Sequence, residues 1–203
     1  MLWLRLANLS KSFDGTKVLD SVSLRVEQGT VLSISGRNGS GKTTLLRIIA
    51  GLLRPSGGSV ECGEGDEPPW QPARLRRELG YVSPDLALYE SLSARENLDF
   101  FARVRGCTRD PNELLDYVGL GGRGDEPIGS FSSGMRQRLK LAFALQASPR
   151  VLLLDEPGVT LDEAGREVVV RAVAEQRPRG VVLLASNDPE EVALGDDVLR
   201  LDV

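Results

Sequence analysis

The chain has 203 residues, 41% of them hydrophobic and 27% charged, which suits one globular domain or one domain with a small subdomain. Its net charge of −4 argues against a broad nucleic-acid-binding face, so we expect no nucleic-acid partner. The first residues resemble a short strand rather than a signal peptide, and no apolar run comes near the roughly 18 residues of a membrane span, so we expect that any role at a membrane would need a partner.

The first part of the chain alternates predicted strands with one helix. Alternating or continuous apolar residues predict strands over residues 3–7, 22–26 and 30–35. A helix is predicted over residues 42–53, directly after a Gly-rich turn. A polar, Gly/Pro-rich stretch over residues 55–72 contains a short strand around Val60, and another strand is predicted over residues 79–83.

The pattern then becomes helical from residue 91 to residue 145. Ser91 and Ser93 are predicted N-caps, and Glu96 follows Ser93 at the spacing of a capping box. Strands and helices alternate afterwards, with strands over residues 151–154, 180–185 and 198–201 and helices over residues 164–175 and from Pro189. The runs VLLL and GVVLLA are uninterrupted, as expected of parallel strands that are covered on both faces. The layout predicts an α/β core with a helical insertion at about residues 85–148.

The segment GRNGSGKTT matches the GxxxxGK[ST] pattern of a phosphate-binding loop and follows a predicted strand. Glycines let the backbone point its N–H groups at phosphate, and the helix that follows adds its positive dipole end. Lys42 should reach the β- and γ-phosphates, and the Thr43 hydroxyl should bind Mg²⁺. A Gly-rich connector is the alternative, which the flanking strand and helix disfavour. The candidate nucleotide-binding residues here are Gly36, Arg37, Asn38, Gly39, Ser40, Gly41, Lys42, Thr43 and Thr44.

Asp155 and Glu156 end the predicted strand VLLLDE. A carboxylate at the end of a strand beside a phosphate loop can hold Mg²⁺, which makes Asp155 a candidate metal ligand. The adjacent Glu156 can polarise an attacking water as a general base. Two solvated acids are the alternative, and the phosphate loop earlier in the chain argues against it.

The segment FSSGMRQRLKLAFAL opens a helix with a small polar turn, shortly before VLLLDE. A Ser at this place is often only a helix cap. Together with GRNGSGKTT and VLLLDE, however, the segment resembles the signature turn of ATP-binding cassette (ABC) ATPases, and the resemblance spans Phe13 to about Leu201. It implies that the turn binds the γ-phosphate of an ATP held by a second subunit. The residues of this turn are Ser132, Ser133, Gly134 and Met135, of which Ser133 and Met135 replace the family's Gly and Gln.

Other elements of the family follow in order. The resemblance implies that Phe13 stacks on adenine, although a core Phe is the alternative. It implies that Leu161 and Asp162 belong to the D-loop, which crosses the dimer interface. It also gives Asp155 and Glu156 the metal-binding and general-base roles that their position suggests.

Two positions depart from the family pattern. Asn187 stands where the family has a switch histidine, and its amide can donate a hydrogen bond to the γ-phosphate but cannot change charge near pH 7. Pro84 stands at the position of the Q-loop glutamine and has no side chain that could ligate Mg²⁺. We offer as a hypothesis that Asp85, the next residue, takes over this ligand role.

The resemblance implies the fold class and the domain organisation. We expect an α/β P-loop nucleotide hydrolase core with a mostly parallel sheet, an N-terminal antiparallel β subdomain and a helical signature subdomain. Residues 1–203 would form a single cassette, with the RecA-like core and β subdomain at about 1–84 and 149–203 and the helical subdomain at about 85–148.

The function that the resemblance implies is Mg²⁺-dependent ATP hydrolysis by a subunit of an ABC transporter, most similar to exporter-type cassettes. A second ABC subunit, expected to be a second copy, would sandwich two ATP molecules with this one. Closure of the dimer would drive a separate membrane-spanning permease, and the chain would lie on the cytoplasmic face and contact the membrane only through that permease. The coupling helix of the permease could dock on an apolar cluster formed by Leu86, Leu88, Tyr89 and Leu92. Burial of this cluster under the helical insertion is the alternative.

Two other functions remain open at this level. One is a non-transport ABC ATPase that acts as an assembly or conformational switch. The other is a weakly catalytic regulatory cassette, which Asn187 and Pro84 suggest and which the presence of Glu156 argues against.

Overall fold

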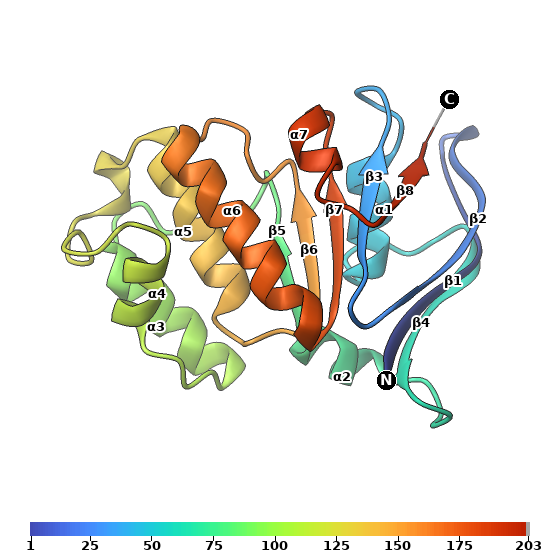
Figure 1. Cartoon of the computed structure of the whole chain (residues 1–203), viewed down its shortest axis with the longest axis horizontal. Coiled ribbons are helices and arrows are strands. Elements are labelled where there is room, and N and C mark those ends of the chain that lie inside the picture. Colours follow the sequence, from blue (N-terminus) through green and yellow to red (C-terminus); the bar gives the residue numbers. More distant parts are fainter. Residues whose placement is uncertain (202–203) are drawn as a thin grey trace.

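The computed structural model describes residues 1–201, and Figure 1 shows two sheets, with one group of helices at the end away from the N-terminal strands and further helices beside the sheets. The first sheet is antiparallel, in the order β2-β1-β4. Its strands are β1 (Leu2–Phe13), β2 (Thr16–Glu27) and β4 (Gly57–Glu64). Strands β1 and β2 are longer than predicted, because polar residues such as Lys11 and Ser12 continue the pairing beyond the apolar stretch.

The second sheet is entirely parallel, in the order β5-β6-β7-β3-β8. Its strands are β3 (Val31–Ser35), β5 (Leu79–Val82), β6 (Val151–Asp155), β7 (Val181–Ala185) and β8 (Asp197–Arg200). Every residue of β6 and β7 is buried, as the uninterrupted apolar runs predict. The predicted parallel core and antiparallel β subdomain are therefore confirmed.

Two helices pack near the first sheet. Helix α1 (Lys42–Ile49) ends four residues before the predicted boundary, because Gly51 takes a left-handed conformation with φ of 71° and Leu52 turns outward. Helix α2 (Pro72–Arg77) begins at the last residue of the predicted polar stretch and continues through residues for which no element was predicted. It was missed because it has no buried residue and therefore no apolar period to detect.

The insertion between β5 and β6 contains α3 (Ala94–Arg105), α4 (Pro111–Tyr117), a 3₁₀ turn η1 (Ile128–Ser130) and α5 (Ser133–Leu145). The capping box is present, since Ser93 Oγ accepts from Glu96 N at 3.1 Å and Glu96 Oε2 accepts from Ser93 N at 2.8 Å. Ser91, the other predicted cap, lies in the turn before the helix and caps nothing.

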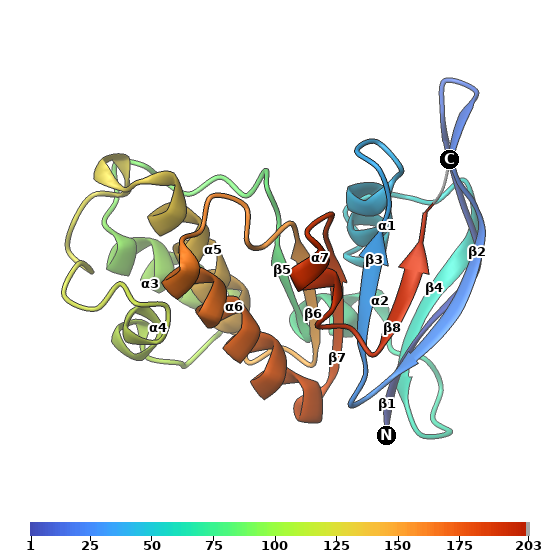
Figure 2. The same ribbon diagram turned by 45° about the horizontal axis from the view of Figure 1, so that its top comes forward.

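Helix α6 (Glu163–Gln176), the 3₁₀ turn η2 (Arg177–Arg179) and the short α7 (Pro189–Val192) complete the chain. Figure 2 shows α3 and α4 at the far end from the antiparallel sheet, which lies beside β8. None of the helices in residues 1–201 is both long and apolar enough to cross a membrane.

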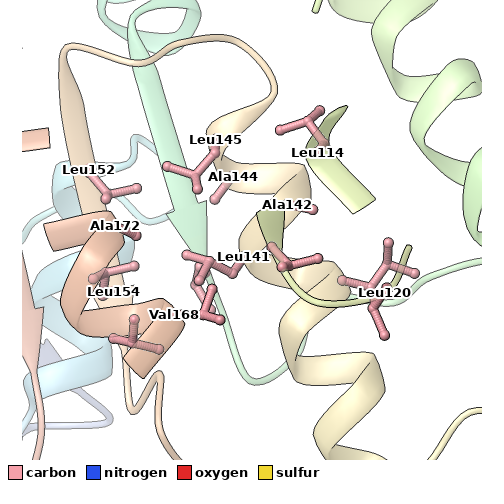
Figure 3. Packing of buried hydrophobic residues seen from close by; sticks show 14 of the residues in the cluster. Leu114, Leu120, Leu141, Ala142, Ala144, Leu145, Leu152, Leu154, Val168 and Ala172 are labelled. Atoms are coloured by element: carbon pink, nitrogen blue, oxygen red, sulfur yellow. The ribbon is translucent and has the colours of Figure 1, made fainter. Parts of the chain in front are cut away.

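Two cores meet at the parallel sheet, and β6 belongs to both. Leu152 and Leu154 join the core formed with α5 and α6, where they lie near Val168 and Ala172 (Figure 3). Leu153 faces the opposite core, which α1 and the antiparallel sheet complete. This sandwich fixes the carboxyl ends of β3, β6 and β7, and the candidate site lies at those ends.

Candidate functional site

The loop between β3 and α1 follows a path that only glycine allows. A Cβ on Gly36 would lie 2.4 Å from Leu201 O and 2.5 Å from Ser40 Oγ. Gly41 is the N-cap of α1 in a left-handed conformation, with φ of 101°. These two glycines turn the chain sharply into α1, so the helix N-terminus faces the site.

Lys42 is the buried cation of the site, with 6% of its surface exposed. Its Nζ donates to Gly36 O at 2.8 Å and to Asn187 Oδ1 at 2.9 Å, and it lies 3.5 Å from Glu156 Oε1. Asn187 Nδ2 in turn donates to Asn38 Oδ1 at 2.6 Å. The structure thus brings together predicted site residues from the loops that follow β3, β6 and β7.

Asp155 is fully buried and accepts two hydrogen bonds. Thr43 Oγ1 donates to Asp155 Oδ1 at 3.1 Å, and Tyr81 OH donates to Oδ2 at 3.2 Å. Burial raises the pKa of the Asp155 carboxyl, while these two hydrogen bonds oppose the rise. Burial, with the nearby Asp155 charge, also raises the pKa of Tyr81 to about 12, so the phenol stays a donor.

The donor set at Thr43 and Asp155 fits Mg²⁺. A hydroxyl and a carboxylate side by side are hard oxygen ligands, and Mg²⁺ usually takes one or two such protein ligands and keeps several waters. Within residues 1–201 there is no cluster of three or more acidic, Cys or His side chains that could enclose a metal. The Thr43–Asp155 pair suits an ion that shares its coordination with water and phosphate.

Glu156 lies where the chain leaves β6, with φ of 48°, a left-handed conformation that non-glycine residues rarely adopt. Its N–H donates to Ala185 O at 2.8 Å, and Ser186 Oγ donates to its Oε2 at 3.4 Å. Strain of this kind typically costs about 1–3 kcal/mol and persists where the surroundings impose it. The turn directs the carboxylate toward Lys42.

The signature turn begins α5. Ser132 is the N-cap, and its Oγ accepts from Met135 N at 3.2 Å. Ser132 and Ser133 are exposed, whereas the Met135 side chain is buried in the core. Any contact of Met135 with a nucleotide would therefore come from its backbone. Gly134 approaches Thr160 closely, because a Cβ on it would lie 3.0 Å from Thr160 O.

The remaining predicted residues lie around this centre. Phe13 is 42% exposed at the end of β1, so the alternative of a core Phe is wrong, and its stacking on adenine stays a prediction. Leu161 is half-buried, and Asp162 caps α6 by accepting from Gly165 N at 2.9 Å. Thr44 and Phe13 line one cavity of about 680 Å³.

Asp85 has a partner other than the Thr43–Asp155 pair. Its carboxylate forms an ion pair with Arg47 of α1, and its side chain is largely exposed. The proposed ligand role of Asp85 stays a prediction. In the predicted apolar cluster, Leu86, Leu88 and Leu92 are half-buried, while Tyr89 is 50% exposed.

Three residues near the site were not anticipated. They are Tyr81, Ser186 and Gln137. Tyr81 contacts Asp155, Ser186 contacts Glu156, and the Nε2 of Gln137 donates to Pro157 O at 3.0 Å. The only available signal was position: Tyr81 and Ser186 lie near the carboxyl ends of predicted parallel strands, where sites gather.

Comparison with known proteins agrees with this geometry. The ABC transporter family matches residues 19–159. A sulfate/thiosulfate import ATP-binding protein, CysA of Mesorhizobium japonicum, is 36% identical over 96% of this chain and 59% of its own length. The daunorubicin resistance ATP-binding protein DrrA3 of Streptomyces coeruleorubidus is 37% identical over 95% of this chain and 63% of its own length.

The fold comparison points the same way. A solved dimeric bacterial ABC transporter cassette, MJ0796, aligns with a TM-score of 0.83 at 26% identity, covering 98% of this chain and 94% of that one. The chain spans about three fifths of the length of the two curated relatives named above. With the phosphate loop, the buried Asp155 and the signature turn in place, the chain belongs to the ATP-binding cassettes of the ABC transporter family.

Proposed function

We propose that the chain binds ATP with Mg²⁺ and hydrolyses it, as the ATP-binding subunit of a transporter whose permease is a separate protein. The observation that supports this most directly is the convergence of Lys42, Glu156 and Asn187 beside the Thr43–Asp155 pair. One relative is named for import and the other for drug resistance, so the direction of transport stays open and the exporter-like resemblance stays a prediction.

Each residue has a role that follows from its geometry. Lys42, held among three oxygen partners, is placed to exchange one of them for phosphate oxygens. Thr43 and Asp155 would hold Mg²⁺, which neutralises charge on the phosphates when bound. Glu156 would accept the proton of the attacking water. Asn187 would donate its amide to the γ-phosphate.

The proposed partner within the ATPase is a second copy of the chain. Ser132 and Ser133 are exposed at the N-terminus of α5, where hydroxyls and backbone N–H groups suit a phosphate. A site for the γ-phosphate there would be completed only by a nucleotide held on the other copy. The dimeric form of the related cassette MJ0796 supports this arrangement.

The proposed docking site for the permease is the apolar cluster in the loop after β5, where Leu86 and Ala87 line one side of the cavity of about 680 Å³. Next to it, the rings of Tyr89, Phe100 and Phe101 pack edge-on or stacked, and Tyr89 and Phe100 are exposed. The cavity is also lined by three arginines, Arg47, Arg76 and Arg105. A partner helix with an apolar face and an acidic group would complement this surface.

The test is MgATP hydrolysis by the purified chain and by Glu156→Gln. We expect the wild type to turn over ATP, and the variant to lose about 10²–10⁴-fold in kcat because Gln cannot accept a proton. The variant should still bind ATP and accumulate as an ATP-bound dimer, which size-exclusion chromatography with light scattering would detect.

The controls separate an active ATPase from a regulatory cassette. Glu190→Gln, an exposed carboxylate on α7, should leave turnover unchanged. If the wild type itself accumulates the ATP-bound dimer without measurable hydrolysis, the chain is a regulatory cassette and the proposal of an active ATPase is wrong.

A further inference from the structure

The loop after β5, residues 83–85, is held by three elements that also build the nucleotide site. Tyr81 lies near the end of β5, two residues before Ser83, and its hydroxyl donates to the buried Asp155. On one side Arg47 of α1 pairs with Asp85. On the other side Lys140 of α5 donates to backbone carbonyls of the loop. The position of this loop is therefore tied to both the phosphate-binding helix and the signature helix.

Lys140 supplies the hydrogen bonds that this particular loop needs. Its Nζ lies 2.6 Å from Pro84 O and 3.3 Å from Ser83 O. Because Pro84 has neither an N–H nor a polar side chain, its carbonyl is its only hydrogen-bonding group. Ser83 O also accepts from Leu86 N at 3.1 Å, which closes the turn. One ammonium thus holds both carbonyls at the start of the loop.

Lys140 is half-buried, and burial lowers the pKa of its ammonium. A partly desolvated cation is stabilised by charge-assisted hydrogen bonds, which are stronger than neutral ones. The pair Arg47–Asp85 is more exposed, with 41% and 68% of the side chains accessible, and exposed pairs of this kind contribute little. Of the two attachments, the one through Lys140 should therefore be the stronger.

Helix α5 connects Lys140 to the rest of the candidate site. It begins at the signature turn, and one turn later Gln137 donates to Pro157 O, directly after the candidate base Glu156. Lys140 lies three residues beyond Gln137 and therefore on the same side of the helix. Both side chains line a cavity of about 640 Å³ together with Glu156. One face of α5 thus contacts the loops that follow β5 and β6.

We propose that Lys140 is a positioning residue for ATP hydrolysis, which fixes the loop after β5 to the signature helix. This rests on the proposed function and adds a residue that does not itself touch nucleotide. Without the ammonium, Pro84 O loses its partner, and the polar contacts left to the loop are the exposed Arg47–Asp85 pair and the hydrogen bonds within the turn itself. The strand end that carries Tyr81 would then move more freely relative to α5, and so would the groups around Asp155.

The experiment compares Lys140→Met, which keeps the apolar stem, with the wild type by hydrogen exchange and by steady-state kinetics. Amide exchange of residues 83–88 should become about tenfold faster, because a charge-assisted hydrogen bond is lost. The kcat for MgATP should fall roughly fivefold to tenfold with KM little changed, since the loss affects geometry rather than nucleotide contacts. Lys140→Arg, which can also donate to two carbonyls, should restore both.

The matched control is Arg138→Met. Arg138 lies on the same helix and donates to Gly119 O at 3.1 Å, within the helical insertion. It should leave both exchange of residues 83–88 and kcat unchanged. Equal exchange in Lys140→Met and wild type would overturn the proposal, and so would an Arg138→Met effect of the same size.

Lys140→Gln, too short to reach both carbonyls, serves if the Met variant does not fold. If the wild type hydrolyses no ATP, the proposed function fails, while the exchange comparison still decides whether Lys140 fixes the loop.

Discussion

At the scale of single residues, Asn187 stands where the resemblance to ABC ATPases places a switch histidine, and it leaves that position without a titratable side chain. Asn187 connects Lys42 to Asn38 through both ends of its amide. A neutral imidazole could accept from Lys42 or donate to a phosphate, but protonation would remove its ability to accept. The amide keeps one acceptor and one donor at every pH.

Asn187→His introduces the only imidazole of the chain and should make turnover pH-dependent. We expect an added ionisation in kcat near pH 6.5, the ordinary value for His, which the wild type lacks. The new imidazole can be followed by NMR without any background from other histidines. A wild-type profile with the same ionisation would show that Asn187 is not what sets the pH response.

Most residues that the structure brings together in the candidate site could be predicted, because their identity and spacing follow from phosphate and metal chemistry. Lys42, Thr43, Asp155 and Glu156 are examples. Tyr81 could not, since its role depends on its strand lying beside β6 in a register that only the folded sheet defines. Lys140 was missed for the same reason, because its partners are backbone carbonyls far away in sequence.

At the scale of elements, two serines precede α3, and only Ser93 caps the helix, whereas Ser91 does not. Ser93→Ala should lower the free energy of unfolding by about 1 kcal/mol, because it removes the acceptor for Glu96 N. Ser91→Ala is the control and should stay within about 0.5 kcal/mol, since Ser91 caps no helix. Urea unfolding measures both, and equal losses in the two variants would contradict the assignment of the cap.

Elements with strong apolar periodicity or continuous apolar runs were predicted well, whereas short polar ones were not. The central parallel strands β6 and β7 follow from burial on both faces. Helix α2 has three arginines and no buried residue, so its stability comes from local and neighbouring contacts that no sequence period reveals. The helical pattern predicted over residues 91–145 forms α3, α4 and α5, which turns at Gly106 and residues 118–127 separate.

At the scale of the whole molecule, stability should depend on two buried carboxyls, those of Asp155 and Glu191. Burial raises the pKa of each in the folded state. As pH rises through the ordinary carboxyl range, the unfolded chain releases these protons before the folded chain does. Their contribution to stability is therefore present at low pH and is lost as pH rises through the raised pKa.

Glu191→Gln should remove the Glu191 part of this loss. Glu191 is 8% exposed and packs closely against Gly158, since a Cβ on Gly158 would lie 2.1 Å from Glu191 Oε1. Gln has nearly the same shape as Glu and can occupy the same space. The variant should be more stable than the wild type at pH 7.5, by about 1 kcal/mol, and should gain less on acidification. The exposed neighbour Glu190→Gln is the control, and equal shifts for both variants would contradict the burial argument.

The strand β6 has one further consequence. Its alternate side chains belong to two cores, Leu152 and Leu154 to one and Leu153 to the other. Neither core can melt while the other keeps β6 in place, so the cassette should lose its structure in a single cooperative step. We therefore expect Glu156, which directly follows this strand, to move together with both cores rather than with one of them alone.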